Sequence, residues 1–238
     1  MYFHENQLSY PWSTKDRDFI NKEHKHYGFI NYSSALTADK VFFNSNYHKD
    51  SFLNELKLFL KRSPDHKELH TIEKIKDKSK VLYIGIDLKR FDRYKTKNEG
   101  PPLILWNHRW EYDKNPEMFF KVLFNLHKKE INYRVAILGE RYNSYPSIFD
   151  EAKEKLKNKI VHFGYCNSSE EYANWLWKAD ILPVTNNQDF FGISIMEALY
   201  CNTYPLLPKR LSYPELIPVN YHDDHIYTNE EDLLNKLK

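Results

Sequence analysis

The stretch Leu103-Ile-Leu-Trp-Asn-His-Arg-Trp-Glu-Tyr-Asp-Lys-Asn-Pro116 begins the regular pattern that predicts the fold. Its first four residues form an unbroken apolar run, which is typical of a strand buried on both faces. Asn115 followed by Pro116 indicates a helix start, because asparagine caps the first backbone N–H groups and proline fits the first helical position. The stretch therefore predicts a buried strand, a charged loop and a helix.

The same order of strand and helix repeats through the rest of the chain. Short apolar runs at 135–138, 160–163, 181–184 and 204–207 are predicted strands, and helices are expected between them. Unbroken apolar strands that alternate with amphipathic helices indicate a parallel sheet covered on both faces. We therefore expect a Rossmann-like α/β domain over residues 101–238, with ligands bound at the carboxyl ends of its strands.

Residues 1–88 show a weaker form of this pattern and are predicted to form a second, partial Rossmann-like domain. Strands are expected at 40–44 and 81–84, a helix over 47–60, and a helix over 27–36 that turns Phe29 and Ile30 inward. The segment 61–80 is charged and poorly patterned, which predicts a loop or a loose helix. Residues 89–100 are polar without an apolar period, and are predicted to be an interdomain linker.

The composition excludes several classes of protein. Two cysteines cannot build a disulfide scaffold, and they fit a reducing compartment. The sequence has no apolar run of membrane-spanning length and no signal-peptide core at its start, so we expect a cytoplasmic protein without membrane contact. Residues 49–97 hold 14 Lys and Arg against 8 Asp and Glu, which fits either a nucleic-acid face or a solvated surface.

The segment Asp189-Phe-Phe-Gly-Ile-Ser-Ile-Met-Glu197 is the first candidate site. It places Asp189 in a strand-to-helix loop and Glu197 inside the following helix. Gly192 lets the backbone approach a ligand closely, and the helix N-terminus favours anions. A carboxylate in the helix could accept hydrogen bonds from a ribose diol. The alternative is an acid near the helix dipole together with a surface glutamate.

The loop between the first predicted strand and helix is the second candidate. Arg109 and Lys114 lie where a diphosphate would bind, between a strand end and a helix N-terminus. The alternative is a pair of exposed cations in a loop that also contains Glu111 and Asp113.

These two motifs in this order resemble the donor half of retaining glycosyltransferases with the two-domain GT-B fold. Other segments are similar to the tRNA-queuosine mannosyltransferases within that class: Tyr2-Phe-His-Glu-Asn-Gln-Leu8, Tyr10-Pro11, Asn107-His-Arg-Trp-Glu111, Leu138-Gly-Glu140, Phe190-Phe-Gly192, Leu199-Tyr-Cys201, Tyr204-Pro205 and Tyr213-Pro-Glu215. The resemblance covers nearly the whole chain.

The resemblance implies that GDP-mannose is the donor and that the acceptor is the cyclopentenediol of queuosine in the anticodon of tRNA(Asp). It implies that Arg109 and Lys114 hold the diphosphate, Glu197 the ribose, and Asp189 the mannose. The same resemblance assigns His4 to the transferred sugar. The remaining implied residues are Phe191, Gly192, Ile193 and Ser194 for the donor, and Glu5, Asn6, Tyr10 and Ser45 for the acceptor or the cleft.

The resemblance also implies a retaining transfer without a metal or other cofactor, in which the departing phosphate accepts the proton of the attacking hydroxyl. Asp16 and Asp18 have the spacing of a metal-binding pair, but they lie in a polar stretch and no metal role is expected. The family usually has Glu where this chain has Asp189, and it has several strands before the segment at which this sequence starts. We therefore expect an incomplete first domain. The alternatives are another GDP- or UDP-sugar transferase of polysaccharide synthesis, and a non-catalytic fragment that binds nucleotide sugar or RNA.

Overall fold

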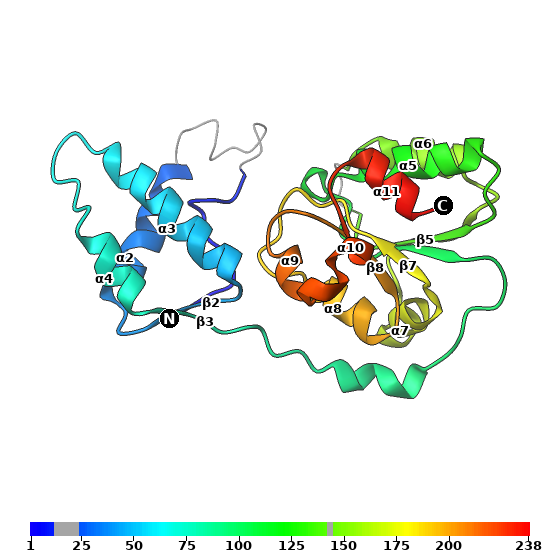
Figure 1. Cartoon of the computed structure of the whole chain (residues 1–238), viewed down its shortest axis with the longest axis horizontal. Helices are drawn as coiled ribbons and strands as arrows, with labels where there is room; N and C mark the ends of the chain where they lie inside the picture. Colours follow the sequence, from blue (N-terminus) through cyan, green and yellow to red (C-terminus); the bar gives the residue numbers. More distant parts are fainter. Residues whose placement is uncertain (12–23, 142–144) are drawn as a thin grey trace. The chain divides into compact units, whose positions relative to one another are not determined.

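The computed structural model describes residues 1–11, 24–141 and 145–238 (Figure 1). The chain divides into two compact units, Met1–Gly85 and Ile86–Lys238, and each unit contains its own parallel sheet. Within the described ranges, no helix combines the length and the apolar character needed to cross a membrane. The predicted acidic pair Asp16 and Asp18 lies outside the described residues.

Unit 2 contains a six-stranded parallel sheet in the order β6-β5-β4-β7-β8-β9. In chain order this is 3-2-1-4-5-6, the order of the doubly wound dinucleotide-binding folds. The order reverses between β4 and β7, and ligands of such sheets bind at this switch point. The strands are β4 (Leu103–Trp106), β5 (Arg134–Leu138), β6 (Ile160–Gly164), β7 (Ile181–Pro183), β8 (Tyr204–Pro208) and β9 (Ile226–Tyr227).

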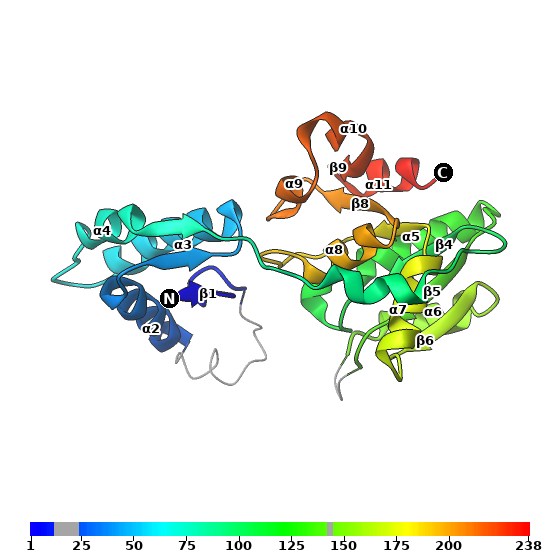
Figure 2. The same ribbon diagram turned by 90° about the horizontal axis from the view of Figure 1, so that it is seen from below.

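Helices cover both faces of this sheet (Figures 1 and 2). One core cluster lies under α5 (Pro116–Lys128), α6 (Ile148–Lys155) and α11 (Glu230–Lys236). The other lies under α7 (Ser169–Lys178), α8 (Ile193–Tyr200) and the short helix η1 (Leu88–Tyr94). The predicted α/β class with a parallel sheet covered on both faces is therefore confirmed. Short elements complete the unit: η2 (Tyr112–Lys114), α9 (Tyr213–Leu216), η3 (Val219–Tyr221) and α10 (His222–His225).

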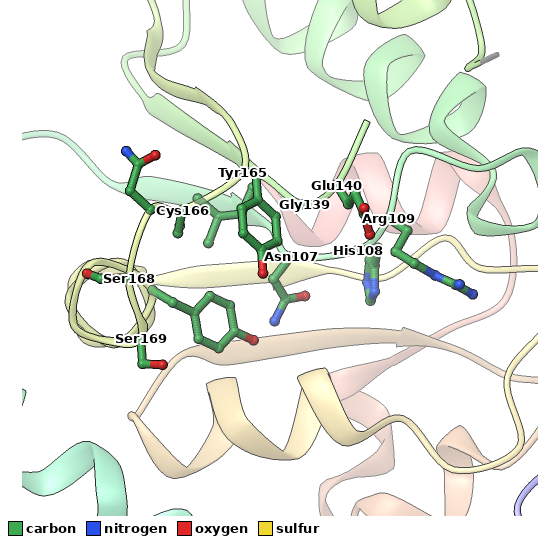
Figure 3. A pocket seen from close by; sticks show the side chains of 12 residues that line it. Asn107, His108, Arg109, Gly139, Glu140, Tyr165, Cys166, Ser168 and Ser169 are labelled. Atoms are coloured by element: carbon green, nitrogen blue, oxygen red, sulfur yellow. The ribbon is translucent and has the colours of Figure 1, made fainter. Parts of the chain in front are cut away.

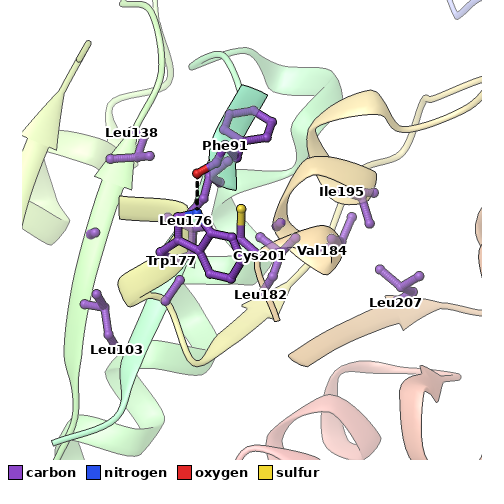
Figure 4. Packing of buried hydrophobic residues seen from close by; sticks show 14 of the residues in the cluster. Phe91, Leu103, Leu138, Leu176, Trp177, Leu182, Val184, Ile195, Cys201 and Leu207 are labelled. Atoms are coloured by element: carbon purple, nitrogen blue, oxygen red, sulfur yellow. Dashed lines mark hydrogen bonds between the residues drawn. The ribbon is translucent and has the colours of Figure 1, made fainter. Parts of the chain in front are cut away.

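The second core cluster joins the strands at the switch point to the helices that carry the candidate site (Figure 4). Leu103 of β4 and Leu182 of β7 are almost fully buried, and Trp177 of α7 packs beside them. Burial of this apolar area fixes the carboxyl ends of β4 and β7 relative to α7 and α8, since close-packed side chains leave few alternative arrangements.

Unit 1 contains a three-stranded parallel sheet, β1 (Tyr2–Phe3), β2 (Val41–Phe43) and β3 (Ser79–Val81). Its helices are α2 (His24–Thr37), α3 (Asn46–Lys61) and α4 (Thr71–Asp77). The core is aromatic, with the rings of Phe3 and Phe43 stacked at 5.2 Å between centroids and Phe52 tilted against both. The predicted helix over 47–60 and strand at 40–44 are confirmed by α3 and β2.

Two details of unit 1 differ from the prediction. Phe29 and Ile30, which were expected to point inward, are 54% and 43% exposed, and α2 instead buries Tyr32 and Ala35. Gly28 also lies on the buried face of α2, where a Cβ would lie 2.9 Å from a methyl carbon of Leu8. The strand expected at 81–84 begins and ends earlier, as β3, and the segment 61–80 contains the ordered helix α4.

The segment predicted to be a linker, 89–100, begins in η1, which belongs to unit 2. Phe91 in this helix is only 2% exposed, and its carbonyl accepts a hydrogen bond of 2.8 Å from Trp177 Nε1 (Figure 4). Sequence polarity concealed this docking, because a single buried aromatic residue in a charged segment leaves no periodic signal.

Candidate functional site

A pocket of about 480 Å³ opens at the carboxyl ends of β4, β5 and β6 (Figure 3). This volume lies within the usual range of small-molecule sites. The three strands are neighbours in the sheet, so the ends and following loops of all three meet at one edge. The lining residues are Asn107, His108, Arg109, Leu138, Gly139, Glu140, Tyr165, Cys166, Asn167, Ser168, Ser169 and Tyr172.

The loop after β4 is held by its tryptophans. Trp106 Nε1 donates to the His108 carbonyl at 2.8 Å, and Trp110 Nε1 donates to the Leu138 carbonyl at 3.1 Å. The ring of Trp110 stacks on Phe149 with 4.2 Å between centroids. These buried contacts fix the backbone that carries Arg109 at the mouth of the pocket.

The loop after β4 is also bonded to the loop after β7, across the switch point. Thr185 Oγ1 lies 3.0 Å from the carbonyl oxygens of both Lys114 and Asn115, and the backbone N–H of Asn187 donates to the Asp113 carbonyl at 2.7 Å. Asn115 caps α5, as predicted, with its side chain accepting from the Met118 N–H. The two predicted motifs therefore belong to one bonded framework.

The two predicted cations have different positions in this framework. Arg109 lines the pocket, is 52% exposed, and has Nη2 at 3.2 Å from Glu111 Oε2. Lys114 is 14% exposed, pairs with Asp113 at 2.9 Å, and donates to the Gln188 carbonyl at 3.2 Å. Each cation therefore has the acidic neighbour that the alternative interpretation expected. Arg109 is the one of the two that lines the pocket.

The acidic motif is a structured turn at the start of α8. Gly192 is the N-cap with a φ of 96°, a left-handed conformation that favours glycine. Asp189 Oδ1 accepts the Phe191 backbone N–H at 3.2 Å, and Oδ2 accepts the Tyr213 hydroxyl at 3.4 Å. Phe191 and Gly192 are buried, and Ile193 is 43% exposed.

Two hydrogen bonds connect the pocket wall to α8. Asn107 Nδ2 donates to the Ser194 carbonyl at 2.8 Å, and the Tyr172 hydroxyl donates to Glu197 Oε2 at 2.8 Å. Both donors line the pocket, whereas Glu197 is 6% exposed and lies behind Tyr172. Asn107 and Tyr172 thus join Ser194 and Glu197 to the wall of the pocket that Arg109 also lines.

His108 is buried beside this framework and carries no charge near neutral pH. Burial, with a smaller contribution from the nearby Lys114 charge, lowers the pKa of His108 to about 3. Its Nδ1 lies 3.4 Å from the Ser194 hydroxyl. The imidazole is therefore a neutral polar group within the framework.

Most of the predicted acceptor residues in unit 1 have local structural contacts. Asn6 is fully buried, and its Oδ1 accepts the backbone N–H groups of Leu8 and Ser9. Ser45 caps α3 by accepting the His48 N–H at 2.9 Å. His4 and Glu5 are exposed, and Tyr10 is half-buried.

The sequence did not single out several residues that line the pocket or contact its wall. Tyr165 is 71% exposed at the pocket mouth, and its position in the loop after β6, a loop that we expected to meet ligand, was the available signal. Asn107 begins the segment Asn107-His-Arg-Trp-Glu111 but was given no role of its own, and Tyr172 belongs to no motif. Arg90, which pairs with Glu197 at 2.6 Å, lies in the segment predicted to be a linker and could not have been found.

Among the described residues, one group of side chains has the composition of a metal site: His162, Cys166 and Glu171. Their ligand atoms lie within 4.8 Å of one another. His162 Nε2 is bonded to the Gly164 carbonyl, and Glu171 Oε2 accepts the Asn167 N–H. We assign no ion to this group.

The sheet order agrees with what comparisons with known proteins find. Residues 89–237 match the family model "Glycosyl transferases group 1", and the chain belongs to this family. Residues 1–86 match the model "tRNA-queuosine alpha-mannosyltransferase N-terminal". The chain is 38% identical, over 247 aligned residues and its full length, to the tRNA-queuosine alpha-mannosyltransferase of Drosophila melanogaster. It spans 63% of that relative's length. The predicted resemblance is therefore confirmed.

Solved glycosyltransferases share the fold. HepE of Anabaena, solved in complex with UDP and glucose, superposes with a TM-score of 0.66 at 15% identity, covering 98% of this chain and 59% of that one. A glycosyltransferase from Rickettsia africae gives a TM-score of 0.64 at 19% identity, covering 89% of this chain and 55% of that one. With these neighbours, the GT-B fold class predicted from the sequence is confirmed.

Proposed function

We propose that this chain forms the donor-binding part of a retaining mannosyltransferase that moves mannose from GDP-mannose to the cyclopentenediol of queuosine in tRNA. The observation that carries the proposal is the bonded framework around the pocket, in which Arg109 stands at the mouth and Glu197 is linked to the wall through Tyr172. The similarity to the Drosophila mannosyltransferase supports the sugar and the acceptor. A tRNA acceptor also fits the expected cytoplasmic location.

In the proposed reaction, the anomeric carbon of mannose loses its bond to the β-phosphate oxygen and gains a bond to an acceptor hydroxyl on the same face. The hydroxyl proton passes to the departing phosphate, so GDP and the mannosylated diol are the products. Arg109 and Lys114 would offset the charge that develops on the diphosphate. No protein nucleophile is required, and we expect neither a metal ion nor another cofactor.

We further propose that Glu197 accepts the ribose hydroxyls and that Asp189 contacts the mannose. In support, Glu197 follows the N-terminus of α8 by one turn, and Asp189 lies in the turn that precedes the helix. His4, Glu5 and Tyr10 remain candidates on the acceptor side, because their side chains are exposed or half-buried.

Isothermal titration of the full chain with GDP-mannose, GDP and UDP-glucose tests the donor assignment. The proposal expects GDP and GDP-mannose to bind with similar affinity and UDP-glucose to bind at least tenfold more weakly. Preference for UDP-glucose would replace the mannose assignment by the alternative of a UDP-sugar transferase of polysaccharide synthesis.

The acceptor is tested by incubating the chain and GDP-mannose with queuosine-containing tRNA and measuring migration on boronate gels. Capping of the cyclopentenediol should change the retardation that boronate causes, and tRNA lacking queuosine is the matched control. Unchanged migration together with donor binding would support the alternative of a non-catalytic chain that binds the nucleotide sugar.

A further inference from the structure

The carboxylate of Glu197 is held by two side chains from different elements. Arg90 Nη2 lies 2.6 Å from Oε1, and the Tyr172 hydroxyl donates to Oε2 at 2.8 Å. The Glu197 side chain itself is only 8% exposed. Burial of a carboxylate is costly unless it is paired and hydrogen-bonded, and Arg90 and Tyr172 supply both contacts.

Arg90 is placed by a docked helix rather than by a free connection. Its neighbour Phe91 is buried, and the Phe91 carbonyl accepts the Trp177 indole N–H at 2.8 Å (Figure 4). The Tyr200 hydroxyl of α8 donates to Asp92 Oδ1 at 2.9 Å. The helix η1 is thus bonded to both α7 and α8, and the Arg90 guanidinium reaches Glu197 from a fixed backbone.

Tyr172 joins this network to the pocket, because it lines the pocket and donates to Glu197. Burial, reinforced by the Glu197 charge, raises the pKa of Tyr172 well above its usual value. The phenol therefore stays protonated and always donates to the carboxylate. An ionised carboxylate offers about four acceptor positions, so two remain for a ligand after Arg90 and Tyr172 are bound.

We infer that Arg90 and Tyr172 are positioning residues that hold the Glu197 carboxylate oriented to accept two adjacent hydroxyl groups of the nucleotide ribose. The inference rests on the proposed function, because it takes the ligand to be a nucleoside diphosphate. It adds that recognition of the ribose diol depends on a residue of η1 that need not touch the nucleotide.

The test compares GDP with 2′,3′-dideoxy-GDP by isothermal titration, in the unaltered chain and in Arg90→Ala, Arg90→Lys and Tyr172→Phe. The unaltered chain should prefer GDP by at least tenfold. Arg90→Ala should lose about tenfold in GDP affinity and leave dideoxy-GDP affinity unchanged, so that the preference disappears. Arg90→Lys should restore part of it, and Tyr172→Phe should reduce it by a smaller factor.

The matched control is Arg93→Ala, which removes a cation of the same helix that lies over the Tyr94 ring. It should leave both affinities unchanged.

The outcomes separate the inference from the proposed function. Failure of the unaltered chain to bind GDP would overturn both. An Arg90→Ala variant that binds GDP but keeps its preference over dideoxy-GDP would overturn the inference alone. Equal losses for both nucleotides would also overturn it, because they would indicate a structural role of Arg90.

Discussion

Gly139 lies against the backbone of His108 so closely that a Cβ atom on it would stand 2.0 Å from the His108 carbonyl oxygen. Its φ of 111° is also one that residues with a side chain rarely adopt. The carbonyl that it approaches accepts the indole N–H of Trp106. The close approach of the residue after β5 to the loop after β4 therefore requires glycine, at a position that lines the pocket.

We predict that Gly139→Ala destabilises unit 2 by about 2 kcal/mol or more, because a positive φ and a backbone clash act together. The matched control is Gly164→Ala. Gly164 also has a positive φ, 129°, but a Cβ on it would have no atom from outside its own chain neighbours within 4 Å. The control should cost about 1 kcal/mol, from the backbone conformation alone. Urea unfolding measures both, and equal losses in the two variants would contradict the clash argument.

The sequence predicted the elements of unit 2 well because most strands of its sheet are largely buried. The run 103–106 became β4 with all four residues buried, and the helix expected to contain Glu197 is α8. The pattern of apolar residues marks whole buried strands and helices. It therefore also located the two motif loops between them and the edge of the sheet at which these loops meet.

The contacts that complete the site could not be predicted in this way. Arg90 meets Glu197 across 107 positions of sequence, and no local pattern marks a single tertiary ion pair. The short strand β9 was also missed, since a two-residue strand has no period to detect. The inward assignment of Phe29 and Ile30 was wrong because it considered hydrophobicity alone. The face of α2 that packs against the rest of unit 1 instead carries Tyr32 together with the small residues Gly28 and Ala35.

The pocket position of Arg109 gives a prediction about phosphate binding. Arg109→Gln should lower GDP affinity about tenfold, since a charge-assisted hydrogen bond contributes about 1.5–3 kcal/mol before solvent screening of an exposed group reduces it. Affinity for guanosine, which has no phosphate, should not change. Isothermal titration measures both.

The control for this prediction is Arg141→Gln, which removes an exposed cation that lies over the Tyr145 ring outside the pocket lining. It should leave GDP affinity within about twofold, because its charge is screened by solvent. A loss as large as that of Arg109→Gln would indicate general electrostatic attraction and no specific contact.

Two buried histidines predict that the protein loses stability in mild acid. Burial lowers the pKa of both His48 and His108 to about 3, whereas the unfolded chain binds these protons near pH 6.5. Between these values the unfolded state binds more protons than the folded state, so the free energy of unfolding falls as pH falls from 6.5 towards 3. Each histidine should contribute up to about 1.4 kcal/mol per pH unit.

Urea unfolding at pH 7 and at pH 5 measures this effect. His48→Gln tests unit 1 and His108→Gln tests unit 2, and each should make the stability of its own unit less dependent on pH. The exposed His26 supplies a matched control, His26→Gln, which should leave the slope unchanged. A pH dependence that survives both buried substitutions would assign the effect to other groups.

The charge of Asp189 is predicted to act on transfer rather than on donor binding. In Asp189→Asn the amide oxygen can still accept the Phe191 N–H, so the turn before α8 should persist while the negative charge is lost. GDP affinity should stay within about threefold, and transfer of mannose should fall by about a hundredfold or more.

Asp189→Glu restores the charge but moves it by about 1.5 Å, and a misplacement on the order of 1 Å can also cost about a hundredfold. Single-turnover transfer with titration of GDP separates the two effects. Tyr213→Phe, which removes the other donor to this carboxylate at 3.4 Å, should have a smaller effect than either variant. Full transfer activity in Asp189→Asn would remove the carboxylate from the mechanism and leave the turn as its only role.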